Sequence, residues 1–149
     1  MKEYFQNNLI ELSLLQLEKP YEYKATGPNK FDCSGLTYYL YKELFNIDIN
    51  KNGYGINDIS KQRTSNIGTL TEYTTQEKKH LKILEKGDLL FFNTQLLKNN
   101  KNSEHIGIYI GNNLFIHASP KKKKIVITKL SNKWIKKLIA SKNIINDII

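Results

Sequence analysis

The residues best suited to chemistry are one cysteine and two of the three histidines in this chain of 149 residues. Cys33 is the only cysteine, and leucines recur after it at positions 36, 40 and 44. That spacing predicts an amphipathic helix, and Asp32 has the short acceptor side chain that favours its N-cap. Cys33 would then lie in the first turn, where free N–H groups and the helix dipole lower the pKa of a thiol and make it a nucleophile. A lone cysteine is also commonly a small buried hydrophobic residue, so the histidines must decide between these interpretations.

The two histidines lie on predicted neighbouring strands at residues 105–110 and 114–119. In each strand the isoleucines occupy one face, and His105 or His117 lies on the other. The two apolar faces coincide when a three-residue loop, 111–113, puts His117 opposite Gly107 and makes His105 its diagonal neighbour. One cysteine and two histidines then resemble the nucleophile, base and orienting group of a thiol enzyme. A zinc site is the competing interpretation, although no ligands occur at short spacing.

The segments that must position these residues indicate an α+β fold. Helices are expected at residues 4–17, ended by Pro20, and at residues 33–45, with a weak helical signal at 56–63. Strands are expected at residues 89–92, 105–110, 114–119, 125–130 and 139–145, with a short helix from Ser131 to Leu138 before the last strand. Helices first and a meander afterwards predict N-terminal helices packed on one antiparallel sheet, in a single domain over residues 1–149.

Composition limits the classes of partner. The net charge of +9 suggests anionic surroundings such as nucleic acid, membrane or cell-wall polymer. No basic helix with a base-reading face occurs, so we expect no nucleic-acid partner, and the lysines at 121–124 are interpreted as a solvated turn. No apolar run reaches the roughly 20 residues of a membrane span, and the first residues lack a signal-peptide layout. We expect a monomer that stays in the cell, leaves it without a cleaved signal, or has already lost one.

Four sequence blocks together resemble the NlpC/P60 family. They are FDCSG at residues 31–35, KGDLLFF at 86–92, HIGIYIG at 105–111 and FIHA at 115–118. The blocks follow the family's order, and the likeness extends from about Ile10 to near Ile145. The family consists of cysteine peptidases with a papain-like fold that cut peptidoglycan stem peptides. The resemblance implies peptidoglycan or its stem peptides as substrate, and a reaction that needs no metal or cofactor.

The resemblance also implies catalytic roles. Cys33 matches the nucleophile, His105 the general base and acid, and His117 the third residue that orients the base. Pro20 and Tyr21 are similar to the family's entry segment, in which the tyrosine lies at the oxyanion side of the cleft.

Four further residues are expected to bind substrate. Asp32 and Ser34 match family positions that contact the substrate's peptide, and Asp32 suits an amine. Arg63 lies in a segment similar to the family's Arg-Thr/Ser-Ser, and its planar side chain suits a carboxylate. Lys24 replaces a glycine of the family and would add a second cation near the same entry. The loop at residues 93–104 is longer than the family's usual link and would cover part of the His105 side.

These features favour a peptidoglycan D,L-endopeptidase, such as one that cuts the D-Glu–diamino acid bond through an acyl-enzyme on Cys33. An amidase, acyltransferase or toxin acting on another amide or acyl group is a second hypothesis, and an inactive wall-binding module is a third. The intact Cys–His–His set argues against an inactive module. Cys33 precedes His105, which favours the peptidase branch over relatives that acylate lipids. Such an enzyme would act at the cell wall if secreted or carried there by a phage or mobile element.

Overall fold

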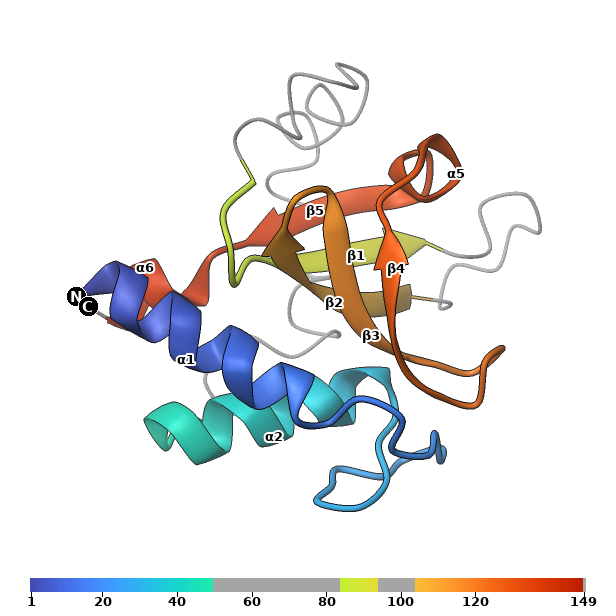
Figure 1. The fold of residues 1–149 in the computed structure, drawn as a ribbon, viewed down its shortest axis with the longest axis horizontal. Helices are drawn as coiled ribbons and strands as arrows, with labels where there is room; N and C mark the ends of the chain where they lie inside the picture. Colours follow the sequence, from blue (N-terminus) through green and yellow to red (C-terminus); the bar gives the residue numbers. More distant parts are fainter. Residues whose placement is uncertain (50–83, 94–103, 149) are drawn as a thin grey trace.

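Two N-terminal helices pack on one face of an antiparallel sheet (Figure 1). In this computed structural model the described residues are 1–49, 84–93 and 104–148. Their elements are α1 (Lys2–Leu14), α2 (Cys33–Phe45), β1 (Leu89–Asn93), β2 (Glu104–Gly111), β3 (Leu114–Ser119), β4 (Lys124–Lys129), α5 (Asn132–Ile135), β5 (Leu138–Lys142) and α6 (Ile144–Ile148). The strands lie in the order β4-β3-β2-β1-β5, so β1 to β4 form a meander and β5 pairs with β1. The α+β class and the helix-on-sheet arrangement are confirmed.

Helix α2 has the bounds that its leucine spacing predicts. The Asp32 side chain accepts a hydrogen bond of 2.6 Å from the Gly35 N–H, which satisfies one of the free donors of the first turn. Leu36 and Leu40 are fully buried in the core between the helices and the sheet. The helix ends at Asn46, whose left-handed backbone (φ 54°) stops it.

The hairpin of β2 and β3 has the predicted register with a different turn. Ile108 pairs with Ile116, as the coincidence of apolar faces requires. The three-residue loop is wrong, because Asn112 and Asn113 form a two-residue turn in which both have positive φ, 52° and 63°. The register shifts by one residue between Tyr109 and Gly111, and this bulge restores the coincidence of faces.

The two faces of the sheet carry different cores. The helix-facing core contains Ile106, Ile108 and Ile116 together with residues of α1 and α2. The opposite face carries a second, more aromatic core that includes Phe92, Phe115, Tyr109 and Leu130. His105 and His117 belong by strand alternation to this second face, and both are buried.

The C-terminal segment differs from the expectation of one strand at residues 139–145. Strand β5 ends at Lys142, and helix α6 follows, with Ile144 and Ile145 fully buried. The Asn143 side chain accepts a 2.9 Å hydrogen bond from the Asn146 N–H, which starts the helix. Apolar spacing does not distinguish a buried strand from a buried helix over so short a run.

The other expectations are close to the structure. The first helix begins at Lys2 and ends at Leu14, a shift of two or three residues from the predicted limits 4–17. Ser131 is the N-cap residue of α5, although its side chain makes no capping hydrogen bond. The expected extension of this helix to Leu138 is wrong, because α5 ends at Ile135 and Leu138 is the first residue of β5. The helical signal at residues 56–63 lies outside the described residues. None of the helices in the described part of the chain has the length and apolarity needed to cross a membrane.

Candidate active site

Cys33 is the first residue of α2, and a loop folded against the helix terminus holds it there. The Asp32 carboxylate joins the two parts, since it accepts from the Gly35 N–H and, at 2.9 Å, from the Lys24 N–H. The Asp32 N–H in turn donates to the Ala25 carbonyl at 2.9 Å. A Cβ atom on Gly35 would lie 1.9 Å from that carbonyl oxygen, so only glycine lets the loop lie so close. The packing of the loop beside the thiol therefore requires glycine at position 35, three residues after Asp32.

The two histidine rings meet on one face of the sheet, as predicted. The Nε2 atom of His105 lies 2.6 Å from the Nδ1 atom of His117, a hydrogen-bond distance. The other nitrogen of His117, Nε2, lies 2.8 Å from the Oγ1 atom of Thr128 on β4. The absence of a side chain at Gly107 leaves room for the rings on this face, because a Cβ atom there would clash with the Phe115 ring at 2.7 Å. This leaves Nδ1 of His105 as the nitrogen not engaged with His117.

Aromatic side chains enclose the histidine pair. Phe115 stacks on His117 with ring centroids 4.6 Å apart, and Trp134 meets the same ring edge-on at 5.4 Å. Trp134 also lies 6.1 Å from His105, and Phe92 lies 6.4 Å from it. Sequence reasoning missed Trp134 and Thr128; the alternation that puts Phe115 and His117 on one face was the available signal for the stacking pair.

Burial keeps both histidines neutral near pH 7. It lowers the pKa of His105 to about 4, and the positive charge of Lys137 adds to this effect. Burial also lowers the pKa of His117 to about 3, with His105 contributing further. Each neutral ring therefore has one N–H donor and one nitrogen acceptor.

The expected lowering of the Cys33 pKa is wrong in direction. Burial raises the pKa of the thiol, and the negative charge of Asp32 raises it further. The backbone N–H groups of Ile106, Ser34 and Cys33 itself lower it by a smaller amount. Sequence position predicted the helix terminus correctly, but the burial of the sulfur outweighs it. The Ile106 hydrogen bond puts the thiol next to the residue that follows His105.

Tyr21 and Ser34 lie beside this thiol. Burial raises the pKa of the Tyr21 hydroxyl, with added contributions from Cys33 and Asp32, so the three groups are neighbours. The Ser34 hydroxyl is 3.3 Å from Asp32 Oδ1. Because its pKa is raised, Tyr21 stays protonated and can donate a hydrogen bond at neutral pH.

Of the two cations predicted to bind substrate, Lys24 lies on the surface and Arg63 lies outside the described residues. Lys24 is exposed, and its ammonium lies 5.6 Å from the ring centroid of Tyr23. Its φ of 67° is left-handed, the conformation that glycine adopts most easily, which explains glycine as the family's preference there. Arg63 and residues 94–103 of the long loop lie outside the described residues.

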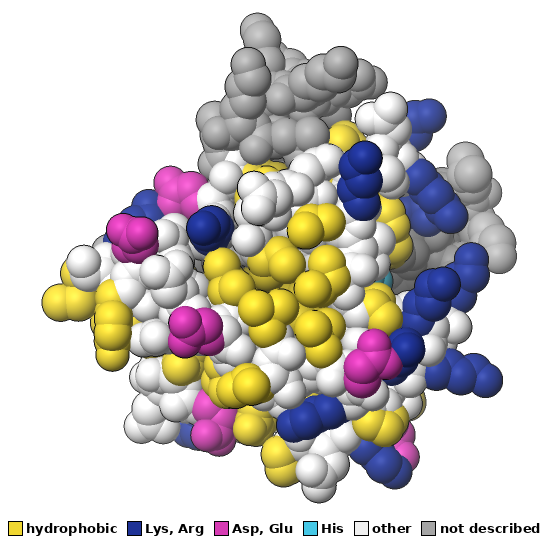
Figure 2. Space-filling view, viewed as in Figure 1, with side chains coloured by type: hydrophobic (Ala, Val, Ile, Leu, Met, Phe, Trp, Pro, Cys, Tyr) yellow, Lys and Arg dark blue, Asp and Glu magenta, His cyan; other side chains and the backbone are white. Residues whose placement is uncertain are grey.

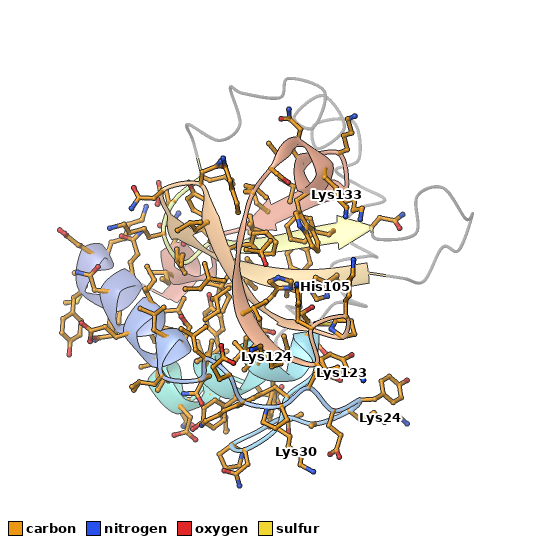
Figure 3. The ribbon with its side chains drawn as sticks, turned by 45° about the vertical axis from the view of Figure 1, so that its right-hand side comes forward. Lys24, Lys30, His105, Lys123, Lys124 and Lys133 are labelled. Carbon is orange, nitrogen blue, oxygen red and sulfur yellow. The ribbon has the colours of Figure 1, made fainter. Side chains whose placement is uncertain are left out.

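The surface around the histidine pair is basic. Figure 2 shows basic side chains along the right-hand edge of the molecule. In the view of Figure 3, His105 lies between Lys133 of α5 and the lysines Lys123 and Lys124 at the β3–β4 connection. Within the described ranges, no group of three His, Cys, Asp or Glu side chains is arranged to hold a metal ion.

The fold and this constellation define a family. The chain belongs to the NlpC/P60 family, whose model matches residues 18–143. It is 36% identical over 121 residues to the murein DD-endopeptidase MepH of Escherichia coli K12, covering 80% of this chain and 38% of the relative. It is 26% identical over 147 residues to the probable endopeptidase YafL of the same organism, covering 95% and 52%. The chain thus spans between about two fifths and half of the length of these relatives.

Solved structures share the fold. NlpC2 from Trichomonas vaginalis superposes with a TM-score of 0.65 at 23% identity, over 93% of this chain and 46% of that one. The NlpC/p60 domain of the peptidoglycan hydrolase SagA gives a TM-score of 0.59 at 20% identity, over 91% and 97%. These similarities establish the fold of the chain, and any activity must be argued from its own residues.

Proposed function

We propose that this chain is a cysteine peptidase of the cell wall that hydrolyses amide bonds in peptidoglycan stem peptides. The bond is of the D,L type, such as D-Glu–diamino acid. The observation that carries the proposal is the 2.6 Å contact between His105 Nε2 and His117 Nδ1. It leaves the second nitrogen of His105 available as a base, next to the strand residue whose N–H contacts the Cys33 thiol.

His105 moves the protons in this mechanism. Its Nε2–H donates to His117, so Nδ1 holds a free lone pair that takes the thiol proton as the sulfur attacks the amide carbon. The imidazolium then returns that proton to the leaving amine, which breaks the C–N bond and leaves an acyl-enzyme on Cys33. A water molecule, deprotonated by His105, hydrolyses the thioester and restores the thiol.

Two donors serve the oxyanion that forms during attack. The Cys33 backbone N–H lies at the helix terminus, and the Tyr21 hydroxyl lies beside the thiol. The raised pKa of Cys33 means that the resting pair is a neutral thiol and a neutral imidazole. Proton transfer therefore accompanies attack, because a preformed thiolate is disfavoured here.

Substrate binding is assigned to the loop and helix terminus around the thiol. Asp32 and Ser34 flank the nucleophile, and the partly exposed carboxylate of Asp32 suits an ammonium group. Lys24 and Arg63 supply cations for a stem-peptide carboxylate, with Arg63 assigned from its sequence segment alone. The enzyme acts as a monomer at the cell wall in this proposal.

A DD-endopeptidase is the second candidate, because MepH carries that name and is 36% identical to this chain. Both activities use the same nucleophile and base and differ in which peptide bond lies over the thiol. The two activities therefore differ in how the stem peptide is positioned in the site, and the reaction products distinguish them.

Digestion of purified sacculi, followed by mass analysis of the released muropeptides, tests the proposal. A D,L-endopeptidase shortens stems to dipeptides, whereas a DD-endopeptidase converts cross-linked dimers to monomers with unshortened stems. The Cys33→Ala variant should release neither product. If the wild type shortened no stem in sacculi of several wall types, the D,L proposal would fail, and monomers alone would establish the DD alternative.

A further inference from the structure

Thr128 ends a chain of hydrogen bonds that begins at His105. Its hydroxyl oxygen lies 2.8 Å from Nε2 of His117, whose Nδ1 lies 2.6 Å from His105. Thr128 is on β4 opposite Phe115, and His117 is opposite Val126, so Thr128 is a diagonal neighbour of His117 on the same face. The three side chains come from three adjacent strands.

Packing fixes the His117 ring but leaves its proton unassigned. Phe115 stacks on one side of the ring, at 32° between planes, and Trp134 meets it edge-on at 71°. Aromatic contacts of this kind set where the ring lies and do not distinguish Nδ1 from Nε2. The hydrogen-bond partners decide which nitrogen carries the hydrogen.

The charged form of His105 permits only one arrangement. Once His105 holds a proton on both nitrogens, its Nε2–H must donate to Nδ1 of His117, which must therefore be unprotonated. The single proton of neutral His117 then lies on Nε2 and points at Thr128 Oγ1. Thr128 must accept, and its own proton can go to water because the residue is only partly buried.

We propose that Thr128 is a positioning residue: by accepting from His117 Nε2–H, it holds His117 in the tautomer that stabilises the His105 imidazolium. This rests on the proposed function, in which His105 receives the thiol proton. Thr128 touches neither substrate nor thiol in this role. It acts through His117, so its loss should reduce turnover and leave binding unchanged.

Thr128→Val tests this, because valine has nearly the shape of threonine and lacks the hydroxyl. We expect kcat on sacculi-derived stem peptides to fall roughly tenfold with KM within twofold, since an acceptor is lost from a buried polar chain. The acidic limb of the pH profile should move to lower pH, because the imidazolium is less stable. Thr128→Ser should restore most of the activity. Val126→Ala, on the same face opposite His117, controls for loosened packing and should keep kcat near the wild-type value.

Ring ¹⁵N NMR tests the same proposal without substrate. The chain has three histidines, so the ring signals can be assigned by substitution. His117 should show an Nε2–H tautomer in the wild type and Thr128→Ser, and a mixture or the Nδ1–H form in Thr128→Val. If Thr128→Val kept the wild-type tautomer, kcat and pH profile, the proposal would be overturned. If the wild type cleaved no stem peptide, the proposed function would fail, and the tautomer readout would still decide the role of Thr128.

Discussion

At the scale of single residues, the negative charge of Asp32 opposes the ionisation of the neighbouring Cys33 thiol. Asp32 caps the helix whose N-terminus stabilises a thiolate, yet its own charge raises the pKa of Cys33. The same side chain therefore caps the helix terminus and weakens the acidity of the Cys33 thiol. Reaction through a neutral thiol and a neutral His105 is consistent with this compromise.

Asp32→Asn should separate these two effects. Asparagine is an equally good N-cap, so the helix should persist, while removal of the charge should lower the pKa of Cys33. The measurement is the pH dependence of alkylation by iodoacetamide, whose midpoint should lie above the usual value of about 8.5 in the wild type. The midpoint should be lower in the variant. Ser34→Ala, which removes a neutral contact of Asp32, should leave the midpoint in place, and an unchanged midpoint in Asp32→Asn would contradict the electrostatic account.

The histidines should differ in how severely their loss affects turnover. In the proposed mechanism His105→Ala removes the base and acid, so it should reduce kcat by about 10²–10⁴-fold. His117→Asn keeps an acceptor near the position of Nδ1, so roughly a tenth of the activity should remain, a loss the size of one hydrogen bond. Steady-state rates on a synthetic stem peptide measure both. Equal losses in the two variants would mean that His117 does more than orient His105.

At the scale of elements, the loop before α2 is a tight fit. The Ala25 carbonyl lies where a Gly35 side chain would be, and the Lys24 N–H is fixed on Asp32. Lys24 adopts the left-handed region there, which costs a residue with a Cβ atom about 1–2 kcal/mol.

Lys24→Gly should therefore stabilise the protein, the reverse of the usual effect of a glycine substitution. The expected gain in the free energy of unfolding is about 0.5–1 kcal/mol, since relief of the left-handed backbone exceeds the entropy that glycine loses on folding. Urea unfolding measures it. Lys24→Ala removes the same charge and keeps the backbone cost, so it should change stability little. A gain of equal size in Lys24→Ala would assign the effect to the lysine side chain.

Sequence reasoning was accurate where the determinants are local. The bounds of α2 followed from leucine spacing and the Asp32 cap, and the shared face of His105 and His117 followed from alternation. It failed where a tertiary contact decides. Thr128 reaches His117 from a separate strand, and no spacing rule connects the two. The burial that raises the pKa of Cys33 likewise depends on how the helix terminus meets β2.

At the scale of the whole molecule, the buried pair of His105 and His117 imposes a pH limit on stability. Two imidazoles with strongly lowered pKa values stay neutral in the folded state over a range in which the unfolded chain takes up protons. Asp88 works in the opposite direction, because burial raises the pKa of its carboxyl group and folding then favours the protonated form. Its hydrogen bonds from the Glu85 N–H and from Asn143 reduce that opposing effect.

The free energy of unfolding should therefore be level well above pH 6.5 and should fall as the pH drops through 6.5 toward 4. Well above 6.5 both histidines are neutral in both states; as the pH falls through 6.5, the unfolded chain binds up to two more protons than the folded protein. The slope is then at most about 2.7 kcal/mol per pH unit, and Asp88 makes it smaller. Urea titrations at half-unit steps of pH measure this slope. His117→Asn removes one of the two groups and should roughly halve it, whereas Val126→Ala should lower stability by the same amount at every pH. A wild-type stability that stayed level from pH 6.5 to 4.5 would mean that the buried pair is not held neutral by the fold.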